Sequence, residues 1–316
     1  MSAPVGIPIL CYHSIDVSGS LVSTSPALFA SHMAYLAANH YRVVSMAEAV
    51  EGCTNGELLG RRTVVLTFDD GYANNHAEAF PVLRGYGFRA TFYIATGFVG
   101  ARASWMIRDL TTMFPGLKQG ADVSELVSRC DRALVGRRIP YLLRLDPTRA
   151  AFEIQALLDA AEFSMMTWAQ LRVLSQAGME IGDHSYSHPF LTEMTDLEVE
   201  AELVQSRVRL ESEIGRPVRS VCYPYGAYSA NVAQVVRYAG YTSACTTESG
   251  LTNFLSSDRY AMRRLLISDR DSLGRFRMMM SGVGRRILEL KPWAKRMLGA
   301  VRPPKKVRTM RATGSA

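Results

Sequence analysis

Two adjacent aspartates are the first residues in this sequence whose type and position indicate chemistry. Asp69 and Asp70 follow the apolar run TVVLTF and precede Gly71. Neighbouring carboxylates repel each other, and a bound cation would relieve the repulsion by taking one as a ligand and leaving the other as a base. The alternative is an Asp-Asp-Gly turn that merely ends a strand.

Two histidines form the second pattern. His184 and His188 belong to the segment HSYSH, which follows the predicted strand Met179–Gly182. Histidines four residues apart can point the same way and bind one metal ion. With one aspartate they would make a set of ligands for a divalent ion that leaves positions open for water and substrate. A single histidine is more often structural, so the pair favours a metal site.

A turn supplies the third pattern. The segment 223–226 reads Tyr-Pro-Tyr-Gly and follows another apolar run. Such a turn exposes backbone N–H groups and an aromatic ring, although an ordinary tight turn has the same composition. Its position at a third strand end favours a functional role.

Short strands alternate with helices along the chain, and these elements must position the three patterns. The strand segments are rich in Val, Ile, Tyr and Phe and are too short for helices. The predicted strands are Ile7–Cys11, Arg42–Val44, Val64–Phe68, Ala90–Ile94, Met179–Gly182, Ser220–Tyr223, Thr242–Cys245 and Arg264–Ile267. Helix starts are indicated by Ser25-Pro26 and by capping boxes at Ser45–Glu48, Thr167–Gln170 and Thr195–Glu198.

This alternation predicts an α/β fold with a parallel sheet. About eight strands favour a barrel over an open sheet, and parallel barrels place their chemistry at the carboxyl ends of strands. All three patterns follow a predicted strand. Residues 101–165 interrupt the alternation, so we expect a mostly helical insertion there, which could shape a substrate groove or serve only as structure.

Charge is distributed unevenly over the 316 residues, whose net charge is +7. From Arg275 to the end there are 12 basic residues and one acid, whereas residues 1–274 hold 24 basic and 28 acidic residues. This asymmetry indicates that the tail has its own partner. Nothing in the rest of the chain favours nucleic acid as that partner.

The tail, residues 271–316, is predicted to be basic and amphipathic. Apolar residues recur at helical spacing between 276 and 301, and Pro292 is expected to divide this segment into two helices. The segment could lie on an anionic membrane surface, or its apolar face could pack on the barrel. From Pro303 onward we expect disorder.

Compartment is predicted from the start of the chain and the cysteines. The sequence begins without the features of a signal peptide and contains no long apolar run. Its five cysteines have no CxxC spacing, so buried free thiols are expected. We therefore expect a cytoplasmic protein, peripheral at the inner face of the membrane if the tail binds lipid.

Together, the three patterns resemble the motifs of the polysaccharide deacetylases of the NodB-homology type, carbohydrate esterase family 4. That family has TFDDG, HxxxH and RxPYG-like motifs in this order, here Thr67–Gly71, His184–His188 and Cys222–Gly226. The resemblance covers roughly residues 5–270. It implies a distorted (β/α) barrel of about seven strands over residues 1–270, and one divalent ion, Zn²⁺ or a similar metal.

The resemblance also implies roles for individual residues. Asp70, His184 and His188 would hold the metal, which would activate a water molecule, and Asp69 would be the general base. The backbone N–H of Tyr225 would help to stabilise the oxyanion. The implied substrate is an N-acetylated sugar in a polysaccharide, an oligosaccharide or a lipid-linked glycan.

Two departures from the family pattern require replacements. The arginine that begins the third motif is Cys222 here, and Arg264 is our candidate to position the base, ahead of Arg263; both could instead be surface residues. The family's final LxH motif is absent, because no histidine follows residue 188. His13 ends the first predicted strand, which neighbours the last strand in a closed barrel. We therefore assign His13 as general acid, an arrangement that resembles the circularly permuted bacterial deacetylases of poly-N-acetylglucosamine.

Other residues and functions stay open at this point. Tyr72 and Trp168 could line a sugar site, although core packing suits Trp168 better, and His32, His40 and His76 receive no role. The motifs define the reaction centre but not the substrate, so a non-sugar amide or ester is an alternative. A non-catalytic carbohydrate-binding or membrane-scaffold relative is the alternative outside enzymes.

Overall fold

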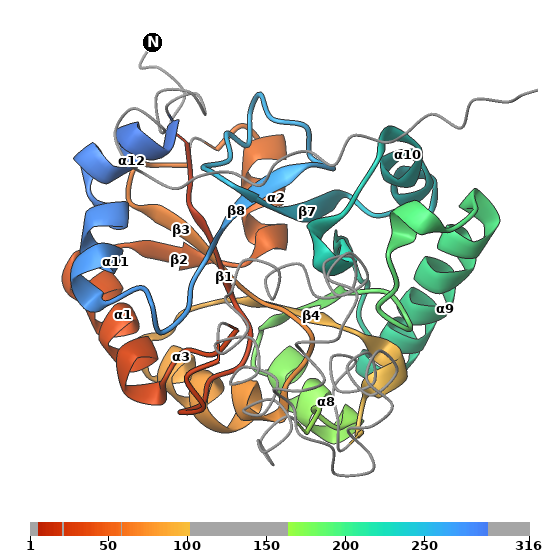
Figure 1. Ribbon diagram of the computed structural model, residues 1–316, viewed down its shortest axis with the longest axis horizontal. Helices are drawn as coiled ribbons and strands as arrows, with labels where there is room; N and C mark the ends of the chain where they lie inside the picture. The colour runs from red at the N-terminus through yellow and green to blue at the C-terminus, as the bar shows by residue number, and fades with distance from the viewer. Residues whose placement is uncertain (1–5, 21, 58, 102–163, 290–316) are drawn as a thin grey trace, which may run out of the picture.

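Eight parallel strands form the centre of the computed structural model, which describes residues 6–20, 22–57, 59–101 and 164–289. Figure 1 shows the helices packed around these strands. The strands are β1 (Ile9–Tyr12), β2 (Arg42–Val44), β3 (Thr63–Phe68), β4 (Thr91–Ile94), β5 (Glu180–Asp183), β6 (Ser220–Cys222), β7 (Ser243–Ser249) and β8 (Met262–Leu266).

The first strand closes the barrel. On one side β1 pairs with β8, where Leu10 lies opposite Leu265, and on the other it pairs with β3, where Leu10 lies opposite Leu66. The ring therefore runs β1-β8-β7-β6-β5-β4-β3, and β2 adds to the first half of β3. This closed ring of seven parallel strands confirms the predicted barrel.

Helices cover the outside of the ring. The α-helices are α1 (Pro26–Ala38), α2 (Met46–Thr54), α3 (Phe80–Tyr86), α8 (Trp168–Gln176), α9 (Asp196–Ile214), α10 (Ala230–Tyr238), α11 (Leu273–Met280) and α12 (Gly282–Glu289). Short turns of other helix types are η1 (Asn75–Ala79), η2 (Thr96–Phe98), η5 (Leu191–Glu193) and η6 (Pro224–Gly226). The three predicted capping boxes are present at the starts of α2, α8 and α9, so the sequence signals for helix starts are correct.

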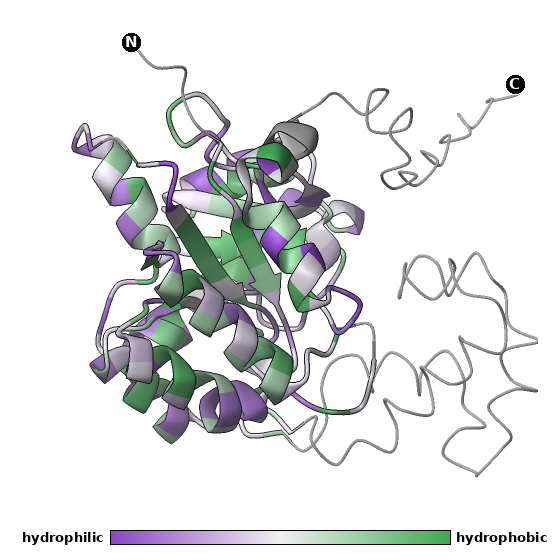
Figure 2. Cartoon of the chain, turned by 90° about the vertical axis from the view of Figure 1, so that its left-hand side faces the viewer, coloured by the Kyte–Doolittle hydropathy of each residue, from purple (hydrophilic) through white to green (hydrophobic). Residues whose placement is uncertain are grey.

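Strand periodicity separates two faces of the barrel wall. Leu10 and Tyr12 join the apolar cluster that the helices cover, whereas Ile9 belongs to a second cluster that includes inward-facing residues of the other strands. Because successive strand residues alternate between faces, Cys11 shares the inward face with Ile9. In Figure 2 the strands are largely hydrophobic, while the surrounding helices mix hydrophobic and hydrophilic residues.

The helix α2 packs at the amino ends of the strands. The backbone N–H of Met46 donates to Oγ1 of Thr91, and that of Ala47 donates to the carboxylate of Glu180, at the starts of β4 and β5. This packing closes the end of the barrel opposite the three sequence motifs. The carboxyl ends of the strands are left for the functional site.

The described part of the tail packs on the barrel. In α11 the Phe276 ring is buried and stacks on His32 of α1, with ring centroids 4.0 Å apart. A break at Ser281 separates α11 from α12. Pro292 and the basic residues beyond it lie outside the described residues, so the predicted break at Pro292 and the membrane contact stay predictions.

The predicted insertion falls on residues 102–163, which lie outside the described part of the chain. The described residues on its two sides are adjacent, because the N–H of Met165 donates to the carbonyl of Ala101 at 2.9 Å. No helix among the described residues is long and apolar enough to span a membrane.

The packing of α11 gives a prediction about stability. Phe276→Ala removes a fully buried ring from between α1 and α11, so it should lower the free energy of unfolding by about 3–5 kcal/mol. Met278→Ala on the same helix is the matched control, because Met278 is 54% exposed and its loss should cost less than about 0.5 kcal/mol. Urea unfolding followed by circular dichroism measures both. Equal values for the two variants would contradict this packing.

Candidate active site

The strand ends bring the predicted site residues together. Asp69 and Asp70 follow β3, and its final residue Phe68 pairs with the last residue of β1, Tyr12. The histidine pair follows β5, and the Pro-Tyr-Gly turn follows β6. His13 comes directly after β1, while Arg264 lies within β8, the other neighbour of β1.

Strained backbone is concentrated in these motifs. Five non-glycine residues in the described ranges have positive φ, and four of them are Asp70 (73°), Ser185 (63°), His188 (54°) and Tyr225 (58°). Left-handed conformations of this kind cost on the order of 1–3 kcal/mol each unless the surroundings stabilise them, and they are frequent at functional sites. Packing therefore imposes the directions in which these residues leave the strand ends.

Asp70, His184 and His188 form a compact and buried group. Oδ1 of Asp70 lies 3.4 Å from Nε2 of His184 and 3.6 Å from Nε2 of His188, and the three side chains are at most 3% exposed. The two imidazole rings are nearly perpendicular, with centroids 4.7 Å apart. One ligand atom from each residue lies within 4.8 Å of the others, so all three can reach one cation.

The donor set fits a divalent metal ion. Oδ2 of Asp70 is buried and has no hydrogen-bond partner among the described residues, which is costly unless a cation compensates. The Nδ1–H of His184 donates to the carbonyl oxygen of Cys222 at 2.7 Å, which directs Nε2 toward Asp70. Two imidazole nitrogens and a carboxylate are ligands of zinc sites that keep a position open.

Burial and charge act in opposite directions on this group. Burial alone would raise the pKa of Asp70, but the hydrogen bond from His184 and the charges of the neighbouring histidines lower it to about 2. Burial would lower the pKa of His184, but the hydrogen bond to Asp70 and the charges of both aspartates raise it. The site therefore holds Asp70 as a carboxylate, the form that binds metal.

The buried guanidinium of Arg264 pairs with the carboxylate of Asp69. Nη1 of Arg264 donates to Oδ1 of Asp69 at 2.7 Å, and Nη2 donates to Oδ2 at 2.6 Å. Arg264 is 1% exposed, and its Nε–H donates to the carbonyl of Thr246 at 2.9 Å. Arg263 instead has an exposed side chain that pairs with Glu248. Burial would raise the pKa of Asp69, but the charge and hydrogen bonds of Arg264 hold it well below its usual range.

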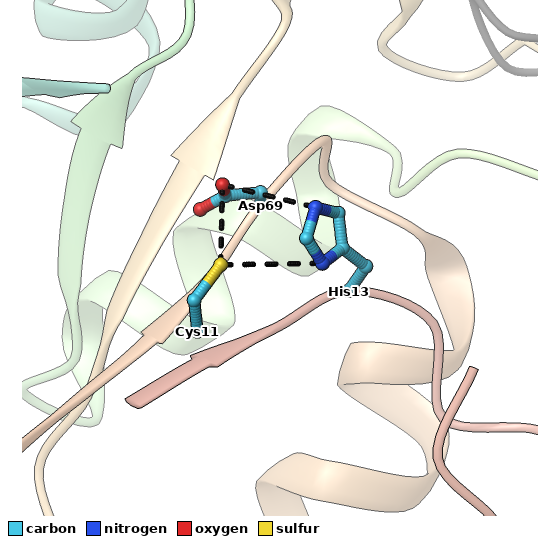
Figure 3. A group of neighbouring side chains, drawn as sticks. All are labelled: Cys11, His13 and Asp69. Atoms are coloured by element: carbon cyan, nitrogen blue, oxygen red, sulfur yellow. Dashed lines mark hydrogen bonds and ion pairs between the residues drawn. The ribbon is translucent and has the colours of Figure 1, made fainter. Parts of the chain in front are cut away.

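His13 lies beside the carboxylate of Asp69. Its Nε2 is 3.9 Å from Oδ2 of Asp69, and its side chain is 14% exposed, so one edge of the ring can reach a ligand. The carbonyl of His13 accepts a hydrogen bond from Nδ2 of Asn75 at 2.7 Å, which fixes the end of β1. Figure 3 shows His13 and Asp69 turned toward each other, with the thiol of Cys11 beside both.

The Pro-Tyr-Gly turn is held by contacts on both sides. The Tyr225 ring stacks on Phe190 with centroids 3.8 Å apart and meets His188 edge-on at 4.7 Å. Its carbonyl accepts a hydrogen bond from Oγ1 of Thr247 at 3.1 Å. Gly226 has φ +69°, and a Cβ there would lie 2.3 Å from the backbone nitrogen of Thr247. The turn thus keeps the Tyr225 ring next to His188.

Two thiols near Asp69 were not foreseen from the sequence. Sγ of Cys11 lies 3.5 Å from Oδ2 of Asp69, and Sγ of Cys222 lies 3.4 Å from the same oxygen. The prediction of buried free thiols was correct for both, but their contact with Asp69 was missed. Alternation was the available signal, since Cys11 and His13 are two residues apart and face the same side of a strand.

Asp183 is a second residue that the sequence reasoning missed. It precedes His184, is fully buried, and accepts a hydrogen bond from Oγ of Ser206 at 2.6 Å and another from the hydroxyl of Tyr241. Burial raises its pKa to about 6. The bond from Ser206 ties the end of β5 to α9, and the bond from Tyr241 adds a second anchor, so the loop that carries both histidines is stabilised.

The two aromatic residues considered for a sugar site have different environments. Tyr72, two residues after Asp70, is fully buried, so its ring is not an open platform for a sugar. Trp168 is partly buried at the start of α8 and lines a cavity of about 680 Å³ together with Tyr186 and Arg209. His32 of α1 stacks on Phe276 of α11.

The sequence and the fold both match a known family. Residues 57–244 match the family described as polysaccharide deacetylase, so the chain belongs to that family, and the predicted resemblance is confirmed. The class of protein is therefore that of hydrolases that remove acetyl groups from sugar polymers.

Individual relatives agree with this membership. The chain is 24% identical over 265 residues to YxkH of Bacillus subtilis (strain 168), named as a polysaccharide deacetylase, covering 84% of this chain and 72% of that protein. It is 25% identical to the poly-β-1,6-N-acetyl-D-glucosamine N-deacetylase of Escherichia coli (strain K12), covering 86% of this chain but only 38% of that protein. The solved deacetylase PplD of Streptococcus pyogenes has a similar fold, with a TM-score of 0.64 and 21% identity over 88% of this chain and all of that one (100%).

The Arg264–Asp69 pair gives a prediction about pH. The folded-state pKa of Asp69 is depressed, so the pair stabilises the protein above the unfolded pKa and loses this effect as pH falls through the folded pKa. Arg264→Met removes the positive charge beside Asp69 but leaves the carboxylate buried, so the pKa of Asp69 should rise. The acidic limb of the kcat/KM profile should therefore move to higher pH. It should also lower the free energy of unfolding at neutral pH by about 3–5 kcal/mol.

Arg263→Met is the matched control, because that residue is the exposed neighbour in the same strand. Its acidic limb should coincide with that of the unmodified protein. An unchanged acidic limb in a folded Arg264→Met variant would contradict the role of Arg264 in keeping Asp69 ionised.

Proposed function

We propose that this protein is a metal-dependent N-deacetylase of an N-acetylated glycan. The observation that supports this most directly is the grouping of Asp70, His184 and His188 beside a second, ionised carboxylate at one end of the barrel. The arrangement separates two roles, because one aspartate faces the histidine pair and the other faces an arginine. In metal-assisted hydrolysis the cation acidifies a water molecule, and a separate base can accept its proton.

Asp70, His184 and His188 would hold the ion, with Zn²⁺ as the proposed metal because of the nitrogen and oxygen donors. A divalent ion bound there supplies positive charge that polarises the acetyl carbonyl and acidifies a nearby water molecule. The carbonyl of Cys222 keeps His184 in the tautomer that presents Nε2 to the ion.

Asp69 and His13 would move the protons. Asp69 accepts a proton from the attacking water, and Arg264 keeps it ionised for that purpose. His13, 3.9 Å from Asp69, then donates a proton to the departing amine. The backbone N–H of Tyr225 donates to the negative charge that develops on the acetyl oxygen.

The acetylated amino sugar is proposed as substrate on two grounds. The family acts on sugar polymers, and the Escherichia coli relative is named for a polymer of N-acetylglucosamine. A lipid-linked form of the glycan, membrane contact through the tail and a cytoplasmic location at the inner membrane face remain proposals that rest on the basic residues after 275. A non-sugar amide or ester is the second candidate substrate.

Acetate release tests the proposed function. The full chain, loaded with Zn²⁺, should release acetate from oligomers of N-acetylglucosamine, and a chelator should abolish the release until metal is returned. Asp69→Asn should remove activity by roughly 10²–10⁴-fold while the metal content stays unchanged, because the base is lost and the ligands remain. Asp258→Asn, at an exposed carboxylate, is the control. Acetate release only from non-sugar acetamides would favour the second substrate class. Acetate release that a chelator does not affect would contradict the proposed metal dependence.

His13→Ala tests the general acid. The variant should lower kcat by roughly 10²–10⁴-fold while metal stays bound, because His13 contacts the base rather than the metal ligands. A substrate with a better leaving group should lose less, since it needs less help from an acid. His40→Asn, at an exposed histidine with positive φ, is the control. Turnover equal to that of the unmodified protein would exclude His13.

A further inference from the structure

Three side chains beside Asp70, His184 and His188, called the metal triad below, form a separate group of ligand atoms. They are Cys11, His13 and Asp69, and one ligand atom from each lies within 4.8 Å of the others. Sγ of Cys11 is 3.5 Å from Oδ2 of Asp69 and 4.0 Å from Nδ1 of His13. Figure 3 shows all three pointing into one space from the ends of two adjacent strands, β1 and β3.

These separations suit a cation that prefers sulfur and nitrogen. Ligand bonds of about 2.0–2.3 Å in a tetrahedral zinc site put neighbouring ligand atoms about 3.3–3.8 Å apart. The sulfur-to-oxygen distance of 3.5 Å already lies in that range. Nδ1 of His13 is 4.0 Å from Sγ and Nε2 is 3.9 Å from Oδ2, so the imidazole must move closer for one of its nitrogens to complete the site. His13 is 14% exposed, which provides a route of entry.

We propose that Cys11, His13 and Asp69 form a second, inhibitory site for a thiophilic divalent cation such as Zn²⁺ or Cd²⁺. The cation replaces the thiol proton of Cys11, which leaves to solvent, and the new bonds run to the thiolate, one imidazole nitrogen and Oδ2 of Asp69. Binding needs no oxidant or other reactant.

The other thiol beside Asp69 is less available for this site. Sγ of Cys222 already accepts a hydrogen bond from Nη2 of Arg264 at 2.9 Å. The histidine that Cys222 would share with Asp69 is His184, a ligand of the first site. Cys11 and His13 carry neither restriction, so they define a site that a cation can occupy while the first site is filled.

Charge makes the second site the weaker one. Arg264 holds both oxygens of Asp69 and repels a cation at Oδ2, whereas in the described part of the chain the carboxylate of Asp70 pairs with two histidines and with no arginine. The second site therefore fills only in excess metal. Occupation ties up both the base and the acid of the proposed reaction, so the inhibitory effect rests on the proposed function, whereas binding itself does not.

Binding is tested by adding Cd²⁺ to the full chain after one equivalent of Zn²⁺. A thiolate that binds Cd²⁺ produces an ultraviolet charge-transfer band, and the metal triad cannot produce it because it has no sulfur. The measurement uses a Cys130→Ser background, because Cys130 lies outside the described residues. The band should saturate at one equivalent and disappear in Cys11→Ser and in Cys11→Ala. It should persist in Cys53→Ser, which removes a buried thiol of α2.

Activity gives the second measurement. Excess Cd²⁺ should inhibit acetate release, and Cys11→Ser should raise the half-inhibitory concentration by at least about tenfold. The proposal is overturned by the absence of a charge-transfer band, or by a band that survives in folded Cys11→Ser and Cys11→Ala. A protein that shows the band but releases no acetate would retain the cation site and refute the proposed function, so the two failures are distinguishable.

Discussion

Asp69 and Asp70 place two carboxylates side by side at a buried end of the barrel, 2% and 1% exposed. Two such charges are stable together only if each has its own compensation. Both carboxylate oxygens of Asp69 pair with the guanidinium of Arg264. Asp70 faces His184 and His188, and the three side chains together can reach one cation. The left-handed backbone at Asp70, φ 73°, directs the neighbouring carboxylates to these different partners.

Barrel closure is what lets distant parts of the chain provide that compensation. The first strand lies between the third and the last, so His13, Asp69 and Arg264 become neighbours although they span most of the described sequence. Which residues meet at the site is therefore decided by the position of their strands in the ring and not by their order along the chain. Arg264 of β8 pairs with Asp69, and the small Cys222 side chain, at the position where the resemblance implies an arginine, lies against that guanidinium.

Patterns of short range predicted most of this architecture. The apolar runs located each of the eight strands in the described ranges, and the ends differ by only a few residues. The exception is β7, which continues to Ser249 with exposed residues that lack an apolar pattern. The capping boxes marked three helix starts because side-chain capping depends on neighbours in sequence. The resemblance supplied the site residues, and the ring supplied the reason to choose His13 and Arg264.

Contacts between distant segments could not be predicted in the same way. The thiols of Cys11 and Cys222 meet Asp69 only because three strands converge, and the stacking of Phe190 on Tyr225 joins loops after β5 and β6. The docking of Phe276 on His32 likewise needs the fold, since amphipathic spacing does not distinguish a face that packs on protein from one that binds lipid.

X-ray absorption spectroscopy of the protein with one equivalent of Zn²⁺ tests the central assignment most directly. Binding by Asp70, His184 and His188 predicts two imidazole nitrogens at about 2.0–2.1 Å, oxygen ligands at a similar distance and no sulfur. A sulfur ligand at about 2.3 Å, or a spectrum without imidazole, would show that the first ion binds elsewhere and would contradict the account.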